Sequence, residues 1–302
     1  MKPGLPVWRS LLYVPVNVEK YVDKAHTRGA DCIQVDLEDS VPAAEKDRAR
    51  TLVPAVAARV RRGGADVVVR INRPLAAAVR DLEASIGPDV NGIAVTKVQS
   101  ADHLRLLDEL VGDLEVRRGL PIGHTRFIAM IETPAAFFRM AEIGRAAGRL
   151  AAMNIGGEDF ALENGMAPTE ETLQMPKQQM IFAARSAGLI PLGFVASVAG
   201  FGDWAAFRAM VGRSRQFGFM GAGCIHPGQV PIVNEEYSPA AAEVAYAHRV
   251  IVENVTAEAA GRASFALDGK MIDVPVVERA QRLLDRHAAI EAREAAKRAA
   301  TG

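Results

Sequence analysis

The segment CIQVDL at residues 32–37 is followed by a helical pattern at residues 43–62 and then by DVVVRI at residues 66–71. A short apolar run, a helix and a second short apolar run are typical of a strand–helix–strand unit, whose two strands lie parallel in one sheet. Both apolar runs are nearly continuous rather than alternating, as expected of strands that are buried on both faces. This unit therefore predicts an α/β fold built on a parallel sheet.

The same alternation continues along the chain on both sides of this unit. We predict strands at residues 11–14, 32–37, 66–71, 92–95, 126–131, 150–155, 190–195 and 219–225. We predict helices after them at residues 18–28, 43–62, 76–85, 101–118, 135–147, 171–187, 204–215 and 240–253. Eight such pairs within residues 1–256 are expected of a (β/α)₈ TIM barrel, which we predict to be the catalytic domain. A doubly wound open sheet is the alternative, but no G-x-G-x-x-G turn follows the first strand to favour its dinucleotide-binding form.

The remaining residues, 257–302, do not fit the barrel pattern. They contain an irregular piece at residues 264–275 and then a charged, Ala-rich helix at residues 277–300. We therefore predict a C-terminal helical extension, and an appendage of this kind packs on a neighbour or caps the barrel.

The composition excludes several classes of protein. The 302 residues include 36 Lys and Arg against 36 Asp and Glu, and 49% of all residues are apolar. This apolar share is that of an ordinary globular protein, and a net charge of zero argues against binding to nucleic acid or to a membrane surface. No apolar run reaches the roughly 18 residues of a membrane span, and residues 1–7 lack the apolar core of a signal peptide. We therefore expect a cytoplasmic protein in which Cys32 and Cys224 are buried free thiols.

Charged side chains follow several predicted strands, at the end of the barrel where active sites lie. Carboxylates that gather in one cleft repel one another unless a cation neutralises them or their pKa values rise. Glu132 and Asp159 follow neighbouring strands and are well placed to share one Mg²⁺, which is usually held by carboxylates together with water and substrate oxygens. Arg70 is a natural partner for a substrate carboxylate, because a guanidinium binds carboxylates through two parallel hydrogen bonds. The charged residues at these strand ends are Asp36, Glu38, Asp39, Arg70, Lys97, Glu132, Glu158 and Asp159.

Structural interpretations of the same residues stay open at this point. Asp39 could cap the helix that follows it, and Arg70 could be an ion-pair partner of the carboxylates after the second strand. Pattern alone leaves metal binding undecided. We interpret His226 as a hydrogen-bonded imidazole that fixes a turn and Asp203 as the N-cap of the next helix.

Short segments in a fixed order along nearly the whole chain resemble the citrate lyase β-subunit family, within the HpcH/HpaI aldolase group. Each segment is short, but their order and spacing together make the match specific. The segments are RSLLYVP at 9–15, DLEDSVP at 36–42, VRIN at 69–72, IET at 131–133, GEDF at 157–160, CIHP at 224–227 and GKMID at 269–273.

The resemblance implies a Mg²⁺-dependent carbon–carbon lyase with a (β/α)₈ barrel. The metal would be bound by Glu132 and Asp159. The substrate would be a short 3-hydroxyacyl-CoA, such as malyl-CoA or citramalyl-CoA, which is cleaved to, or formed from, an acyl-CoA and a 2-oxo acid. CoA is thus part of the substrate. Contacts with the substrate are expected from Arg70, Glu132, Tyr13 and Lys24, with Arg70 on the carboxylate of the acid. Holding metal-bound water or orienting Arg70 is the role expected of Asp36, Glu38 and Asp39.

Asp273, in the GKMID segment, has a separate role in the resemblance. It is implied to be the catalytic acid–base group that exchanges a proton with the thioester fragment, in the active site of a neighbouring subunit. The C-terminal extension would then complete a partner's site, in an obligate homotrimer or homohexamer. Two other functions stay open, a CoA-independent aldolase that acts on 4-hydroxy-2-oxo acids with pyruvate, and a non-catalytic paralogue that binds a keto acid or CoA.

Overall fold

The computed structural model describes residues 2, 4–196 and 202–301. The chain forms two compact units, one of residues 1–237 with 299–302 and one of residues 238–298. The division falls after Tyr237, whereas the sequence predicts the end of the barrel domain at residue 256. The prediction assigns the helix at residues 240–253 to the barrel, and the structure places it in the second unit.

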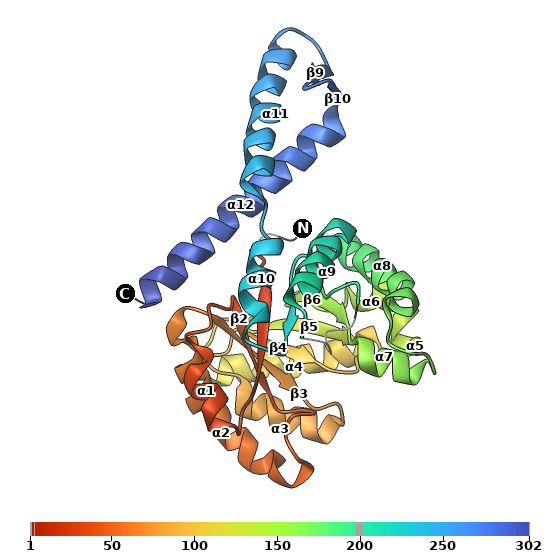
Figure 1. Cartoon of the computed structure of the whole chain (residues 1–302). Coiled ribbons are helices and arrows are strands. Elements are labelled where there is room, and N and C mark those ends of the chain that lie inside the picture. The colour runs from red at the N-terminus through yellow and green to blue at the C-terminus, as the bar shows by residue number, and fades with distance from the viewer. Residues whose placement is uncertain (1, 3, 197–201, 302) are drawn as a thin grey trace. The chain divides into compact units, whose positions relative to one another are not determined.

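Eight parallel strands form the sheet of the first unit, in the order β7-β6-β5-β4-β3-β2-β1-β8. Figure 1 labels β2 to β6 of this sheet, with helices around them. A bridge between Leu192 and Gly221 joins β7 to the chain just before β8 and nearly closes the sheet into a barrel. The predicted (β/α)₈ fold is confirmed. The strands are β1 (Ser10–Pro15), β2 (Cys32–Asp36), β3 (Asp66–Ile71), β4 (Gly92–Val95), β5 (Arg126–Ile131), β6 (Leu150–Ile155), β7 (Ile190–Leu192) and β8 (Ala222–Cys224).

Helices connect the strands, and most of them match the predicted ranges. The predicted helix at residues 135–147 is instead two short helices, because the backbone of Arg139 leaves the helical region between them. Two further helices, α7 and α10, were not predicted. The helices of this unit are α1 (Glu19–Ala25), η1 (Ala43–Glu45), α2 (Lys46–Val60), η2 (Arg61–Gly63), α3 (Leu75–Ser85), α4 (Ala101–Arg117), α5 (Pro134–Phe137), α6 (Met140–Ile143), α7 (Gly157–Glu163), α8 (Glu170–Ser186), α9 (Trp204–Phe217) and α10 (Gln229–Glu236).

The strands β7 and β8 are shorter than predicted. β7 ends at Leu192 because the next residue, Gly193, has a φ of +143°, which side-chain-bearing residues rarely adopt and which takes the chain out of the sheet. The residues before β8 follow Gly218, which ends α9 in a left-handed conformation. Of these residues, Gly221 joins the sheet through its bridge to Leu192 at the end of β7.

The core has an inner and an outer layer, because successive residues of a strand point to opposite faces of the sheet. Inward-pointing apolar side chains form one buried cluster inside the barrel, whereas outward-pointing ones pack beneath the helices. Cys32 and Cys224 are buried free thiols, as predicted. One step further along the strands, the inward positions include Tyr13, Gln34, Arg70 and Asn154. Polar side chains therefore enter the barrel at the C-terminal ends of its strands.

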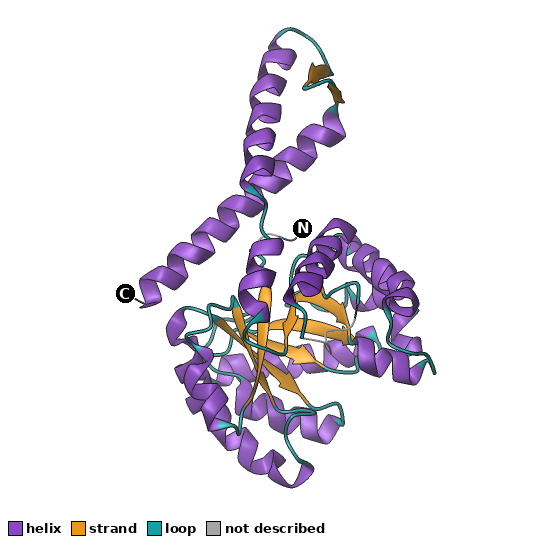
Figure 2. Cartoon of the chain, in the orientation of Figure 1, coloured by secondary structure: helices purple, strands orange, loops and turns teal. Residues whose placement is uncertain are grey.

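The second unit contains α11 (Ala241–Ala259), β9 (Phe265–Leu267), β10 (Lys270–Ile272) and most of α12 (Val274–Thr301), so the predicted C-terminal helical extension is confirmed. Figure 2 shows the two strands as a small hairpin. The prediction of an irregular piece at residues 264–275 is therefore wrong. Asp268 and Gly269 have φ values of 52° and 73°, as a two-residue type I′ turn requires, and Asp-Gly is a preferred sequence for that turn.

A small apolar core of its own holds the second unit together. Ala247 and Val250 of α11 pack with Ile272 of β10 and Ala280 of α12. Within residues 2, 4–196 and 202–301, no helix is both long enough and apolar enough to span a membrane.

Candidate active site

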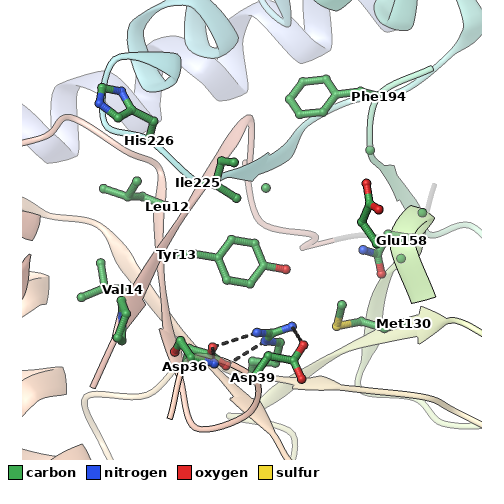
Figure 3. A pocket seen from close by; sticks show the side chains of 18 of the residues that line it. Leu12, Tyr13, Val14, Asp36, Asp39, Met130, Glu158, Phe194, Ile225 and His226 are labelled. Atoms are coloured by element: carbon green, nitrogen blue, oxygen red, sulfur yellow. Dashed lines mark hydrogen bonds and ion pairs between the residues drawn. The ribbon is translucent and has the colours of Figure 1, made fainter. Parts of the chain in front are cut away.

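A cavity of about 950 Å³ lies at the C-terminal ends of the barrel strands (Figure 3). Its lining comes from the ends of the strands, from α1 and from the segments that follow β7 and β8. Figure 3 shows the Tyr13 ring in the middle of this space, with Asp36 and Asp39 on one side of it and Ile225 on the other. This end of an α/β barrel is where catalytic side chains are found.

Arg70, the last but one residue of β3, is held by three carboxylates. Its Nε and Nη2 donate to the two oxygens of Asp36, each at 2.7 Å. Its Nη1 lies 2.7 Å from Glu38 and 3.3 Å from Asp39. The guanidinium also lies over the Tyr13 ring, 5.1 Å from the ring centre. The ion-pair interpretation of Arg70 is thus confirmed, and substrate binding by this residue stays a prediction.

These contacts shift the pKa values of the cluster in opposite directions. Burial disfavours the charged form of Arg70, but the hydrogen bonds to Asp36 and its charge hold the pKa of the guanidinium above its usual range. Burial also disfavours charged Asp36, yet the hydrogen bonds from Arg70 keep the pKa of this carboxyl below its usual value. Burial raises the pKa of Glu38 to about 7, opposed by Arg70 and reinforced by Asp39. Asp36 and Arg70 therefore both stay charged and form an ion pair. The carboxyl of Glu38, by contrast, has its pKa near neutral pH.

Lys97 connects the two predicted metal ligands. Its backbone N–H donates to Glu132 Oε2 at 2.6 Å, and its Nζ lies 3.1 Å from Asp159 and 3.5 Å from Glu38. The backbone of Lys97 has a φ of 47°, a region that residues with side chains rarely adopt and that costs free energy. This strained residue directs its amide and its ammonium group to different carboxylates.

Glu132 is buried, with 2% of its surface exposed, and its carboxylate packs against the backbone of Gly156. A Cβ atom added to Gly156 would lie 2.4 Å from Glu132 Oε1, so this carboxylate fits only beside glycine. Burial raises the pKa of Glu132 to about 7, and the charges of Asp159 and Glu38 reinforce that shift, while the N–H of Lys97 opposes it. Asp159 therefore lies close enough to Glu132 for its charge to raise the pKa of Glu132.

The charge balance of the cluster suits a divalent cation. Within residues 2, 4–196 and 202–301, no group of three or more His, Cys, Asp or Glu side chains is arranged to hold a metal ion by itself. Mg²⁺ does not need such a group, because it is commonly bound by one or two carboxylates and completes its octahedron with water and substrate oxygens. An excess of carboxylates over cations in one cleft favours an added cation. The carboxylates are Asp36, Glu38, Asp39, Glu132 and Asp159, and the cations beside them are Arg70, Lys97 and Lys46.

The other predicted site residues fall in two places. Tyr13 and Lys24 line the cavity, and burial raises the pKa of Tyr13 to about 12, so its hydroxyl stays protonated. Asp273 lies in the second unit, between β10 and α12. The described residues that line the cavity all belong to the first unit, so Asp273 is not among them.

Of the other structural interpretations, those of His226 and Asp203 are confirmed and that of Asp39 is not. The Nδ1 of His226 accepts a hydrogen bond from the N–H of Gly228 at 3.0 Å, which fixes the turn after β8. Asp203 caps α9 by accepting hydrogen bonds from two backbone N–H groups, each at 3.0 Å. Asp39 pairs with Arg70, and the helical turn after it begins at Pro42 with no side-chain cap.

Asn154 and Lys177 line the cavity and were not predicted as site residues. Lys177 is 5% exposed and its Nζ donates to the carbonyl of Ala196 at 2.9 Å. Burial lowers the pKa of Lys177 to about 8, opposed by the charge of Glu158. A signal was present for both residues, since Lys177 lies on the apolar face of α8 and Asn154 interrupts the apolar run of β6.

A parallel α/β barrel with its charged side chains gathered at the C-terminal ends of the strands defines a barrel enzyme. Residues 9–227 match the family described as HpcH/HpaI aldolase/citrate lyase. The chain belongs to this family of lyases.

Individual relatives agree with this assignment over nearly the whole chain. The chain is 32% identical to the citrate lyase subunit beta of Leuconostoc mesenteroides subsp. cremoris, over 91% of this chain and 92% of that protein. It is 33% identical to a (3S)-malyl-CoA thioesterase of Cereibacter sphaeroides, over 94% of this chain and 96% of that protein. A solved structure of CitE from Mycobacterium tuberculosis in complex with magnesium, acetoacetate and coenzyme A superposes with a TM-score of 0.73 at 27% identity. It covers 94% of this chain and 99% of that one.

Proposed function

We propose that this protein is a Mg²⁺-dependent carbon–carbon lyase that cleaves or forms a short 3-hydroxyacyl-CoA, such as malyl-CoA or citramalyl-CoA. The products of cleavage are an acyl-CoA and a 2-oxo acid. The observation that carries the proposal is the excess of carboxylates around Glu132, Lys97 and Asp159 at the mouth of a barrel cavity. Among the similar structures, CitE from Mycobacterium tuberculosis is recorded with magnesium, acetoacetate and coenzyme A, which supports this choice of ligands.

In the proposed site, Glu132 and Asp159 hold Mg²⁺, which supplies Lewis-acid polarisation of the 2-oxo acid carbonyl. Glu132 is pre-positioned by the N–H of Lys97 and by the bare backbone at Gly156. Arg70 orients the carboxylate of the acid. Its Nη1 is the group available for this task, because its weaker partner Asp39 is 60% exposed and can give way to the substrate.

The CoA part of the substrate is proposed to lie along α1. Lys20 and Lys24 of this helix, and Arg28 in the turn after it, line the cavity. Their positive charge is opposite in sign to that of the carboxylate cluster. Phosphate groups favour such a wall, because ion pairs with them are charge-assisted hydrogen bonds. Substrate would then span the cavity, with its phosphates at α1 and its acid end at the metal.

Asp273 is proposed to act as the acid–base group in the site of a neighbouring subunit, within a homotrimer or homohexamer. It would give a proton to the carbon of the leaving thioester enolate in cleavage and remove it in condensation. The second unit offers apolar side chains for such a contact. Val252, Val255, Met271 and Val274 are between 61% and 72% exposed in the single chain. Exposed apolar side chains of this kind favour burial against a partner, and a second copy of the chain would provide it.

The proposed activity is tested by following malyl-CoA and citramalyl-CoA cleavage with and without Mg²⁺, measuring the 2-oxo acid and the free thiol separately. We expect release of the 2-oxo acid without release of thiol, lost in Glu132→Ala and kept in Glu163→Ala, which removes an exposed carboxylate of α7. Cleavage of a 4-hydroxy-2-oxo acid instead would support the CoA-independent aldolase. Binding without turnover of any substrate would support the non-catalytic alternative.

The second candidate function is hydrolysis of the same thioester. It is favoured by the 33% identity to a (3S)-malyl-CoA thioesterase over 94% of this chain. Hydrolysis releases free thiol and no 2-oxo acid, so the paired measurement separates the two reactions in one experiment.

The shared site is tested by mixing two inactive variants, Glu132→Ala and Asp273→Asn, after partial dissociation and reassembly. If Asp273 serves a neighbouring subunit, a mixed assembly contains some sites with both native residues and recovers activity. An Asp273→Asn protein with full activity, or a mixture that stays inactive although subunits have exchanged, would contradict this role.

A further inference from the structure

Helix α1 and the turn after it present a row of accessible side chains to the cavity. Tyr21, Lys24 and Arg28 line the cavity, and spacings of three and four residues place them on one side of the helix and its continuation. Lys20 lines the cavity from the position before Tyr21. All four side chains are exposed, whereas Glu132, which lines the same cavity, is 2% exposed. The cavity therefore joins a buried site at Glu132 to an open wall at α1.

The charges of α1 are divided between two surroundings. Its acidic side chains, Glu19 and Asp23, both pair with Arg59 of α2, and none of these three residues lines the cavity. Within residues 2, 4–196 and 202–301, no carboxylate pairs with any of the three cations that α1 and its turn present to the cavity. The open wall therefore offers positive charge that an anionic ligand can neutralise.

Tyr21 adds an independent feature to this wall. Its side chain is 49% exposed, although burial of a large aromatic ring is favourable. The Nζ of Lys20 lies over the ring, 4.9 Å from the ring centre, where the π-face attracts a cation. Because the ring lines the cavity and about half of the side chain stays accessible, a flat aromatic group of a ligand can stack on it.

The combination of an aromatic ring with cations narrows the chemistry of the ligand. Positive charge alone would suit any anionic group, but an accessible ring among the cations favours a flat π-system held close to phosphates. A nucleotide has both parts, since its base stacks on aromatic side chains and its phosphates pair with Lys and Arg. In the proposed function, on which this inference rests, the CoA part of the substrate carries such a nucleotide. We infer that Tyr21 is a specificity-determining residue that stacks on the adenine base of CoA and selects CoA thioesters over thioesters that lack the nucleotide.

The inference is tested with CoA and pantetheine, which share the thiol arm and differ by the nucleotide. Their dissociation constants are measured by titration calorimetry for the full-length protein. We expect Tyr21→Ala to weaken CoA binding by about five- to 150-fold, the range that stacking of one base provides, and to leave pantetheine binding unchanged. Tyr21→Phe keeps the ring and should bind CoA as the wild-type protein does. Tyr21→Leu keeps an apolar side chain without a π-face and should behave like the alanine variant.

The salt dependence of binding separates stacking from charge. Lys24→Met should also weaken CoA binding, but its effect should shrink as NaCl rises from about 50 mM to about 500 mM, because salt screens exposed charges. The effect of Tyr21→Ala should persist over this range, because stacking does not depend on the charge of the side chain. Phe182→Ala serves as the matched control, since Phe182 is an exposed aromatic of α8 that does not line the cavity. It should bind CoA as the wild-type protein does.

The outcomes distinguish this inference from the proposed function. A Tyr21→Leu protein that binds CoA as tightly as the wild-type protein would overturn the inference and leave the proposed function standing. The same holds for a Tyr21→Phe protein weakened as much as Tyr21→Ala, and for a Tyr21→Ala effect that disappears at high salt. Failure of the wild-type protein to bind CoA would overturn both.

Discussion

At the N-terminal end of the barrel two buried arginines pair with carboxylates at hydrogen-bonding distance, whereas at the C-terminal end the carboxylates around Glu38, Glu132 and Asp159 outnumber the cations that contact them. Arg9, just before β1, pairs with Asp31 at 2.8 Å. Arg149, just before β6, pairs with Glu115 at 2.8 Å, and Glu115 also accepts the N–H groups of Gly123 and Thr125. No such balance exists around Glu132, whose pKa is raised by burial and by its neighbours.

The difference separates a stabilising region from the candidate active site. Paired and fully hydrogen-bonded charges at the N-terminal end fix the positions of strands and helices. Crowded carboxylates at the C-terminal end lower stability until a ligand neutralises them, which is the usual relation between active sites and folding stability. Substitutions at the two ends should therefore have opposite effects on the free energy of unfolding.

The largest expected effect is at the N-terminal end. Arg149→Met should lower the free energy of unfolding by about 3–5 kcal/mol, because it leaves the buried carboxylate of Glu115 without its counter-charge. Urea unfolding monitored by circular dichroism measures this loss. A loss below about 1 kcal/mol would contradict the claim that this pair is structurally important.

The next effect has the opposite sign and depends on pH. The pKa of Glu132 is raised from 4.5 to about 7 in the folded protein, so its contribution to stability is present below about pH 4.5 and is lost as the pH rises through 7. At pH 8 without metal, Glu132→Gln should be more stable than the wild-type protein by roughly 1–3 kcal/mol, and the advantage should shrink toward pH 5. Urea unfolding at the two pH values measures it. Equal advantages at pH 5 and pH 8 would refute the assignment of the effect to this carboxyl.

A smaller effect is expected at Lys97, whose ammonium competes with any added cation for Asp159 and Glu38. Lys97→Met keeps the backbone N–H that holds Glu132, and it should tighten Mg²⁺ binding several-fold, on the order of 1 kcal/mol. Titration calorimetry with Mg²⁺ alone measures the change, with Lys270→Met in the second unit as a control for loss of one positive charge. Weaker Mg²⁺ binding in the Lys97 variant would mean that this lysine supports the metal rather than competing with it.

The smallest effect is expected for an ion pair on the surface of the barrel. Arg208 lies 2.6 Å from Glu236 and 2.8 Å from Glu235, and its side chain is 43% exposed. Arg208→Ala should change the free energy of unfolding by less than about 1 kcal/mol, because solvent screens such pairs. The same urea experiment gives the reference against which the Arg149 result is judged.

Much of the fold could be predicted because the strands are buried on both faces. The ranges of β3, β4, β5 and β6 agree with the prediction to the residue. Each is a continuous apolar run bounded by polar or turn-forming residues, and such boundaries define where a strand begins and ends. The hairpin at residues 265–272 was missed although Asp268-Gly269 is a strong turn sequence. Its strands are three residues each, too short to show a periodic pattern.

The candidate site could be predicted only in its outline. Arg70 lies at the end of β3, and Glu132 and Asp159 follow β5 and β6. Because the strand ends of a barrel meet at one edge, sequence position alone predicts that these residues lie at the same end. Lys97 contacts both Glu132 and Asp159, and these contacts depend on its backbone φ of 47°. The sequence around Lys97 does not predict this conformation. The buried Oδ1 of Asn154, which has no hydrogen-bond partner among the described residues, depends on what the neighbouring strands place beside it. The role of Asp273 depends on a second copy of the chain and stays a prediction.

The ring of strands is weakest where β7 meets β8. These strands have three residues each, and the join is made by two backbone hydrogen bonds, from Gly193 to Gly221 at 2.8 Å and from Met220 to Pro191 at 3.0 Å. We expect the amide protons of Gly193 and Met220 to exchange with deuterium long before those of β2 to β5, through local opening rather than global unfolding. Phe194, which lines the cavity, directly follows this join. We therefore expect local opening of the barrel at this position to widen the cavity, while the side at β5 and β6, where Glu132 and Asp159 are proposed to bind Mg²⁺, opens less.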